Sequence, residues 1–293
     1  MPDTPDSFLE NVLNSLYTCL QEAKEAGKNR LVIFDDQNNG LSWRQQQLRM
    51  VGVVEASLND KRVVLFKQAI TPIQDVCDTY YEVLLRVIDE NGDIQGPGLF
   101  LETAARFQLI AQVDRYILEH TVRYLAQNQE DKAHYSINLS GQSLSDESLP
   151  VFAEALFAQY QFNPAQLGFE ITETDIIKNI NVARQTIAYF KSKGCKISLD
   201  DFGTGMSSYA YIAELGIDAI KIDGAFVQKI HEKPQNQAIL RSIVSLARDL
   251  GLDTVAEYVE QQEELSTLAK LNVAFVQGFL LHKPAMMYQP ITT

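Results

Sequence analysis

The sequence predicts an α/β protein, a modified (β/α)8 TIM barrel whose first strand is antiparallel. Three observations support this fold class. Strand-like and helical runs alternate along most of the 293 residues, which is typical of parallel strands joined by crossover helices. The strand-like runs number eight, as a closed barrel requires. The link between the first two strands is too short to hold a crossover helix, so this pair should run antiparallel.

The strands are expected where short apolar runs lie between turn-forming residues. Each of the later strands is preceded by a segment in which apolar residues recur every three or four positions, as in an amphipathic helix. The predicted strands are Arg62–Ala69, Thr79–Val87, His134–Leu139, Leu167–Thr172, Lys196–Asp200, Ala219–Ile222, Thr254–Ala256 and Ala274–Gln277. The predicted helices are Trp43–Asn59, Phe100–Ala126 as one helix or two, Leu149–Tyr160, Asn181–Lys193, Ser208–Leu215, Gln235–Leu250 and Gln262–Leu271.

The first 40 residues are predicted to form a separate segment, so the barrel spans residues 41–293. A helix over Ser7–Lys28 and a strand over Arg30–Phe34 come before a polar loop at residues 35–40, which we take as the boundary. One helix and one strand cannot bury a core by themselves. This segment is therefore expected to be the remnant of an upstream domain or an appendage on the barrel.

Composition limits the partners. With 46% hydrophobic and 22% charged residues the chain should be globular, and its net charge of −13 argues against binding a nucleic-acid polymer or an anionic membrane. No run of about 18 apolar residues occurs, so no membrane segment is predicted. The first residues lack the pattern of a signal peptide, and we expect a cytoplasmic protein. A phosphate ligand would need a bound cation.

Polar residues gather at the ends of the predicted strands, where barrel proteins carry their chemistry. Taken singly, an Asp at a strand end is more often the N-cap of the next helix, and a lone Lys is more often a solvated surface charge. Together, carboxylates brought to one rim would repel unless a cation neutralised them. The residues concerned are Glu82, Arg86, Asn138, Glu170, Glu173, Asp200, Asp201, Lys221, Asp223, Glu257 and Gln277.

The chemistry of this set favours a hard metal ion. Its candidate ligands are oxygens, and none of the four histidines lies in a strand-end motif, which disfavours zinc and histidine acid–base catalysis. Carboxylate and amide oxygens suit Mg²⁺ or Mn²⁺, and adjacent Asp200 and Asp201 suit a two-metal centre. With Lys221 to orient a water and Arg86 to clamp a phosphate oxygen, the set favours phosphoryl ester hydrolysis.

At this point the sequence resembles a known family. Seven motifs occur in order between Trp43 and Pro284 and look like those of EAL domains, the cyclic di-GMP phosphodiesterases. The motifs are Tyr81-Glu82-Val83-Leu84-Leu85-Arg86, Asn138-Leu139-Ser140, Glu170-Ile171-Thr172-Glu173, Asp200-Asp201-Phe202-Gly203-Thr204-Gly205, Lys221-Ile222-Asp223, Ala256-Glu257-Tyr258-Val259-Glu260 and Gln277-Gly278. The resemblance implies hydrolysis of cyclic di-GMP to linear 5′-pGpG with two Mg²⁺ or Mn²⁺ ions, often by a homodimer.

The resemblance also implies roles for individual residues. Glu82, Asn138, Glu170 and Asp200 would bind one metal ion, and Asp200, Asp201 and Glu257 the second. Lys221 would act on the nucleophilic water, while Glu173 would hold the loop after Asp201, which couples substrate binding to dimerisation. Contacts with the substrate would come from Arg86, Gln68, Gln277 and Asp223.

Three departures from the family pattern stand out. The signature triplet reads Glu-Val-Leu at Glu82, which keeps the presumed ligand. Tyr258 and Gln108 occupy positions where the family usually has glycine.

The stretch Leu16–Arg30 resembles the end of a GGDEF cyclase domain without its signature, which implies upstream GGDEF or sensor domains in a longer protein. Two alternatives to the enzyme are a non-hydrolysing cyclic di-GMP receptor that signals through a partner protein, and a scaffold with a vestigial site.

Overall fold

The computed structural model describes residues 51–60, 62–73, 79–89, 91–178, 180–203 and 210–287. The chain divides into two compact units, Met1–Val53 and Val54–Thr293, and all described residues except 51–53 belong to the second. The predicted segment 1–40 lies outside the described residues. The helix expected over Trp43–Asn59 is described from residue 51, and it continues to residue 59.

The sheet closes into the predicted barrel. Its strands follow the order β1-β9-β8-β7-β6-β5-β4-β2, and β2 pairs again with β1. Strand β1 is antiparallel to both β2 and β9, whereas the other pairs in this ring are parallel, so the predicted antiparallel first strand is confirmed. The eight strands are β1 (Val63–Pro72), β2 (Tyr80–Ile88), β4 (His134–Asn138), β5 (Leu167–Thr172), β6 (Lys196–Phe202), β7 (Ala219–Ile222), β8 (Asp253–Ala256) and β9 (Phe275–Val276).

Two further strands lie outside the ring and were not predicted. Strand β3 (Ile94–Gln95) pairs with the end of β2, and β10 (Ala285–Met286) pairs with Phe66 and Lys67 of β1. Each has two residues and, unlike the equally short β9, follows another strand and not a predicted helix, so the alternation of helices and strands did not reveal it.

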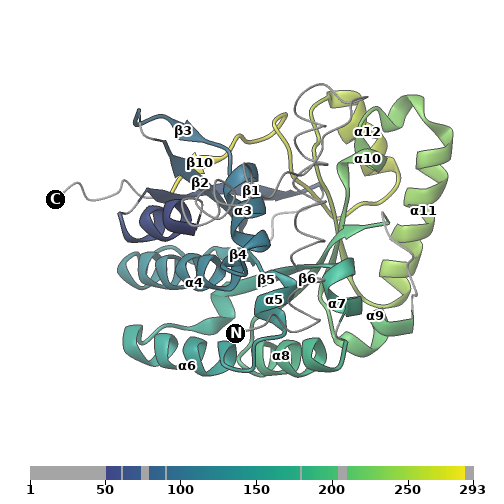
Figure 1. The fold of residues 1–293 in the computed structure, drawn as a ribbon. Helices are drawn as coiled ribbons and strands as arrows, with labels where there is room; N and C mark the ends of the chain where they lie inside the picture. The colour runs from purple at the N-terminus through teal and green to yellow at the C-terminus, as the bar shows by residue number, and fades with distance from the viewer. Residues whose placement is uncertain are drawn as a thin grey trace, which may run out of the picture. The chain divides into compact units, whose positions relative to one another are not determined.

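Helices surround the barrel (Figure 1). Helices α4, α6 and α8 lie side by side along strands β4 to β6. The region predicted as one helix or two consists of two, α3 and α4, separated around Gln108. The helices are α3 (Gly98–Arg106), α4 (Ile110–Gln127), α6 (Leu149–Tyr160), α8 (Ile180–Ser192), α9 (Ala210–Leu215), α11 (Pro234–Asp249) and α12 (Gln262–Lys270). Short turns that the sequence did not predict are α5 (Gly141–Leu144), α7 (Glu173–Lys178), α10 (Gly224–Val227), η1 (Pro164–Gln166) and η2 (Ile230–Glu232).

Alternation along strands β4 to β6 places apolar side chains on the outer face, while the acids Glu170 and Asp200 lie on the inner face. Ile137, Phe169 and Leu199 are fully buried, and the ring of Phe169 packs 4.2 Å from that of Phe190 on α8. Burying one such side chain stabilises a fold by about 1.5–3 kcal/mol. The strand–helix layer therefore holds the barrel closed and leaves the inward positions available for polar groups.

Within the described ranges, none of the helices is both long enough and apolar enough to cross a lipid bilayer.

Candidate active site

The strand register brings the predicted residues to the inside of the barrel. Glu82 is paired with Ser136 on β4, and Asn138 with Glu170 on β5. Because side chains two positions apart share a face, Ser136 and Asn138 point to the same side. Glu82, Asn138 and Glu170 therefore project together, although each lies on a different strand.

The same logic carries the inner face to the next strands. Glu170 is paired with Ser198, two residues before Asp200, and Lys221 is paired with Val255, two residues before Glu257. The pairing of β6 with β7 joins these two halves of the barrel. The predicted site residues thus form an almost continuous ring.

Lys221 lies at the centre of this ring. Its side chain is 1% exposed, and Nζ lies 2.7 Å from Glu257 Oε1, 3.4 Å from Glu82 Oε2 and 3.5 Å from Asp200 Oδ1. It also donates a hydrogen bond to Glu170 Oε2. We call these five residues the Lys221 cluster. Four carboxylates face one ammonium group, so the cluster carries an excess of negative charge.

Three amide side chains hold one edge of the cluster. Asn138 Nδ2 donates to Glu82 Oε1 at 2.8 Å, and Gln277 Nε2 donates to Glu82 Oε2 at 2.6 Å. Gln277 also donates to Gln68 Oε1 at 3.2 Å, while Gln68 Nε2 donates to the carbonyl of His282 at 2.8 Å. Both oxygens of Glu82 thereby accept hydrogen bonds from amide side chains elsewhere in the barrel.

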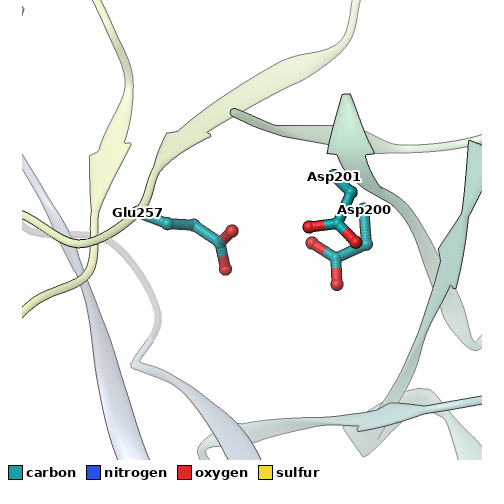
Figure 2. Close-up of side chains that lie close together, drawn as sticks. All are labelled: Asp200, Asp201 and Glu257. Atoms are coloured by element: carbon teal, nitrogen blue, oxygen red, sulfur yellow. The ribbon is translucent and has the colours of Figure 1, made fainter. Parts of the chain in front are cut away.

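Asp200, Asp201 and Glu257 form an acidic group that could hold a metal ion. One oxygen of each lies within 4.8 Å of the others, and Figure 2 shows Glu257 facing the two aspartates across the barrel interior. Adjacent residues of a regular strand point to opposite faces. Here the register shifts between Leu199 and Phe202, and Asp201 has a left-handed φ of +54°. The resulting bulge turns both aspartates toward the same site.

Burial and charge perturb the acids differently. Burial raises the pKa of Glu257 to about 7, against the opposing charge of Lys221. Burial also raises the pKa of Glu170 well above its usual value, and that of Asp201 to a lesser degree. For Glu82 burial is outweighed by Lys221 and by hydrogen bonds from Gln277 and Asn138, so its pKa is lowered. Burial would lower the pKa of Lys221, but the surrounding carboxylates raise it.

The donor set fits a hard divalent ion. Within the described part of the chain, Glu170 Oε1 and Gln277 Oε1 are buried and accept no hydrogen bond, although buried oxygens normally do. The four carboxylates of the Lys221 cluster exceed its single positive charge, an arrangement that cations stabilise. All candidate ligands are oxygens, the type that Mg²⁺ and Mn²⁺ prefer.

Three acids of the cluster, Glu82, Asp200 and Glu257, line a pocket of about 380 Å³ together with Asp201. The pocket is also lined by three of the residues that were predicted to contact the substrate, Gln68, Arg86 and Gln277. Arg86 Nη1 donates to the carbonyl of Leu85 at 2.8 Å. This bond uses one of the five N–H donors of the guanidinium group.

Two predicted residues lie at the starts of short helices, although the charge of Asp223 still contributes to the raised pKa of Asp201. Asp223 is the N-cap of α10, where its side chain accepts a hydrogen bond from Ala225 N at 2.8 Å, and it is not among the described residues that line the pocket. This was the alternative reading of a strand-end aspartate. Glu173 is buried at the start of α7, while residues 204–209, part of the loop that it was predicted to hold, lie outside the described ranges.

A closed barrel with oxygen ligands and a buried lysine at the carboxyl ends of its strands defines a class of barrel proteins equipped to bind divalent metal. Comparison with protein families makes the class specific. The model of the EAL domain matches residues 53–284, and the chain belongs to this family.

Known relatives share this domain. The chain is 33% identical to "Cyclic di-GMP phosphodiesterase PdeF" of Escherichia coli over 94% of its length and 38% of the relative's. It is 31% identical to "Cyclic di-GMP phosphodiesterase PdeB" of Shewanella oneidensis over 89% of its length and 31% of the relative's. The chain therefore spans about a third of the length of these curated relatives.

Solved structures share the fold. "PaMucR Phosphodiesterase, c-di-GMP complex" superposes with a TM-score of 0.75 at 27% identity, covering 81% of this chain and 98% of that one. The FimX EAL domain of Pseudomonas aeruginosa bound to c-di-GMP superposes with a TM-score of 0.76, covering 83% and 99%. Its 24% identity supports the fold alone.

Several pocket residues were missed from the sequence. Tyr258, Glu260 and Phe279 line the pocket but were not assigned to it. Tyr258 was noted only as a departure from glycine, and Gln108 likewise. Both residues adopt the left-handed conformation that glycine favours, with φ of +56° and +58°. The signal available in the sequence was the replacement of a usual glycine, because it marks a position where another residue must adopt the left-handed backbone conformation.

Proposed function

We propose that this domain hydrolyses cyclic di-GMP to linear 5′-pGpG, with two Mg²⁺ or Mn²⁺ ions in the barrel. One observation carries the proposal: four carboxylates from separate strands converge on buried Lys221 and leave an excess of negative charge. The names of the relatives, phosphodiesterases for cyclic di-GMP, support the same substrate. The similar PaMucR phosphodiesterase structure, which is a complex with c-di-GMP, lends further support.

The metal ions would be held by the predicted ligands. Glu82, Asn138, Glu170 and Asp200 would hold one ion, and Asp200, Asp201 and Glu257 the other. Bound divalent ions supply Lewis acidity toward phosphoryl oxygens and make a bound water more acidic. Their positive charge would also reduce the repulsion between the carboxylates of the Lys221 cluster.

The remaining side chains would bind and orient. Lys221 keeps its proton at neutral pH because its carboxylate neighbours raise its pKa, so it can donate a hydrogen bond to the attacking water. Arg86 lines the pocket with guanidinium donors suited to a phosphate oxygen. Gln277 and Gln68 would fix the edge of the site next to Glu82.

The test is direct hydrolysis. Purified protein is incubated with cyclic di-GMP and Mg²⁺ or Mn²⁺, and pGpG is measured by chromatography. We expect product from the wild type and none from Glu82→Ala. A matched control is Glu260→Gln, which removes a carboxylate that lines the pocket outside the Lys221 cluster; it should retain most of the activity.

The receptor hypothesis predicts a different result. Tight binding of cyclic di-GMP without product, unchanged by Glu82→Ala, would contradict hydrolysis and support a receptor. A vestigial scaffold would show no thermal stabilisation by the nucleotide. The complete set of acids in the cluster favours the enzyme over both.

The assembly is part of the same proposal. We infer a homodimer of barrels, a cytoplasmic location, and upstream GGDEF or sensor domains in the longer protein. MucR of Pseudomonas aeruginosa, 28% identical over 90% of this chain, is named as a bifunctional diguanylate cyclase and phosphodiesterase, which supports such an arrangement. Sedimentation of the purified protein with and without cyclic di-GMP would test the dimer.

A further inference from the structure

Two exposed aromatic side chains line the pocket. Among the large hydrophobic side chains that are exposed in the described part of the chain, Tyr258 and Phe279 are the aromatic ones, each 57% exposed. Both border the pocket that contains Asp200, Asp201 and Glu257. Large aromatic side chains usually bury most of their surface. Their joint exposure at one pocket therefore points to contact with a ligand.

The backbone of Tyr258 is held in an unfavourable conformation. Its φ of +56° lies in the left-handed region, which is costly for a side chain with a Cβ atom. The conformation is enforced on both sides, because Glu257 N donates to Ile222 O at 3.2 Å and Val259 N donates to Gln277 O at 3.0 Å. Strained residues of this kind cluster at functional sites.

The segment with Phe279 is fixed to the segment with Tyr258. Besides the bond from Val259 N, Leu280 N donates to Val259 O at 3.0 Å. A Cβ atom at Gly278 would lie 2.1 Å from Val259 O, so only glycine allows the two segments to approach this closely. The two aromatic residues therefore project from a rigid pair of neighbouring segments.

The ring of Tyr258 has a built seat. A Cβ atom at Gly224 would lie 2.6 Å from Cδ2 of Tyr258, so the ring edge rests directly on the backbone of Gly224. The loop is also held from behind by Glu264, which is 1% exposed. Its carboxylate accepts hydrogen bonds from Glu260 N at 2.9 Å and Gln261 N at 3.0 Å. A side chain with a fixed backbone and a fixed ring offers a preorganised surface.

We propose that Tyr258, together with Phe279, forms a stacking platform for a purine base of the bound nucleotide. This inference rests on the proposed function, which supplies a ligand with flat bases. The acidic floor of the pocket would take the phosphate with its metal ions, and the aromatic rim would take the base. Stacking of a base on an aromatic side chain is tolerant of sequence and strengthens binding by about 5- to 150-fold.

Three substitutions at one position test the platform. Tyr258→Phe keeps the ring, Tyr258→Leu keeps an apolar side chain without it, and Tyr258→Gly removes the side chain and the backbone strain. Gln161→Gly is the matched control, because Gln161 is exposed and also left-handed with φ of +48°, at the end of α6. For each protein, KM and kcat for cyclic di-GMP with Mg²⁺ and the thermal midpoint are measured.

We expect Tyr258→Leu and Tyr258→Gly to raise KM about 5- to 150-fold with kcat within about twofold of wild type. Tyr258→Phe and Gln161→Gly should leave KM within about twofold. An unchanged KM in the Leu and Gly variants would overturn the platform while wild-type hydrolysis upholds the proposed function. An equal KM for Tyr258→Leu and Tyr258→Phe would also overturn the platform, because a bulky apolar side chain would then bind the nucleotide as well as an aromatic ring. If the wild type neither binds nor cleaves cyclic di-GMP, the proposed function fails and the platform fails with it.

Discussion

Two lysines on opposite faces of the barrel wall show how differently one residue type is used. Lys221 lies inside, where Glu82, Glu170, Asp200 and Glu257 surround it. The outer lysine, Lys67 on β1, sits among aromatic rings between the sheet and α4. Its Nζ donates to Tyr135 Oη at 2.6 Å and lies 4.4 Å from the centre of the Tyr81 ring and 3.7 Å from Asp131 Oδ2.

The difference is one of charge balance. Lys67 is paired with a single carboxylate and lies near aromatic ring faces, so the charge around it is balanced without a bound cation. Lys221 faces four carboxylates, so the inner group has an unbalanced charge that suits bound cations. Lys67 and Gln68 are adjacent on β1 and point to opposite faces. A one-residue slip in register would exchange these two environments.

The largest effect is expected from Lys221→Met. Removing the ammonium group leaves buried carboxylates without their partner, which should lower the free energy of unfolding by about 3–5 kcal/mol. Urea denaturation without metal measures this loss, and hydrolysis of cyclic di-GMP should disappear with it. If Lys221→Met were no less stable than Lys67→Met, the contrast between the two faces would be wrong.

Divalent metal should stabilise the inner face specifically. At a Mg²⁺ concentration 100 times its dissociation constant, the gain in the free energy of unfolding is about 2.7 kcal/mol. Thermal unfolding with Mg²⁺ or with a chelator measures it. Asp201→Asn should reduce the gain, whereas Glu260→Gln should keep it. An equal loss in both variants would indicate nonspecific screening.

A buried acid outside the barrel offers an intermediate case. Asp114 on α4 accepts hydrogen bonds at Oδ2 from Ser140 N, Ser140 Oγ and Ser143 Oγ. Asp114→Ala would remove the acceptor that these three donors share, at a cost of about 1–3 kcal/mol. Comparing the loss of stability in Asp114→Ala with that in Lys221→Met shows whether hydrogen bonds can take the place of a cation as partners of a buried carboxylate.

The pH dependence of the Asp114 contribution has a definite sign. Burial raises the pKa of Asp114, although hydrogen bonds from Ser140 and Ser143 oppose this. A carboxyl group with a raised folded pKa contributes fully below its unfolded pKa, about 3.9, and loses that contribution as pH rises through the folded value. The stability of Asp114→Asn relative to wild type should therefore increase as the pH is raised from 4 to 7, as measured by urea midpoints. A constant difference over this range would refute the shift.

The smallest effect is expected on the outer face. Lys67→Met should lower the free energy of unfolding by about 1–2 kcal/mol, from lost cation–π and hydrogen-bond contacts, with turnover unchanged. Arg184→Gln, which breaks the exposed pair with Glu214, serves as the surface control at about 0–0.5 kcal/mol. A loss of hydrolysis in Lys67→Met would mean that the two faces are not independent.

Much of this arrangement could be read from local pattern. Short apolar runs such as Thr79–Val87 and Leu167–Thr172 indicated strands with polar residues near their ends, and the short link between the first two strands indicated their antiparallel pairing. Strands β3 and β10 were missed because each is only two residues long and follows another strand, outside the alternation of helices and strands. Asp223 was predicted to contact the substrate, although a lone strand-end aspartate is more often an N-cap, and the structure shows the capping hydrogen bond.

The sequence by itself determined the barrel, its antiparallel first strand and the oxygen-rich residues at the strand ends, because apolar periodicity is a local property of the chain. Only the tertiary structure decided that Lys221 meets Glu82, 139 residues away, and that a bulge turns Asp200 and Asp201 to the same side. It also decided the strained backbone of Tyr258. These features depend on register between distant strands and on hydrogen bonds from neighbouring segments, which no local pattern encodes.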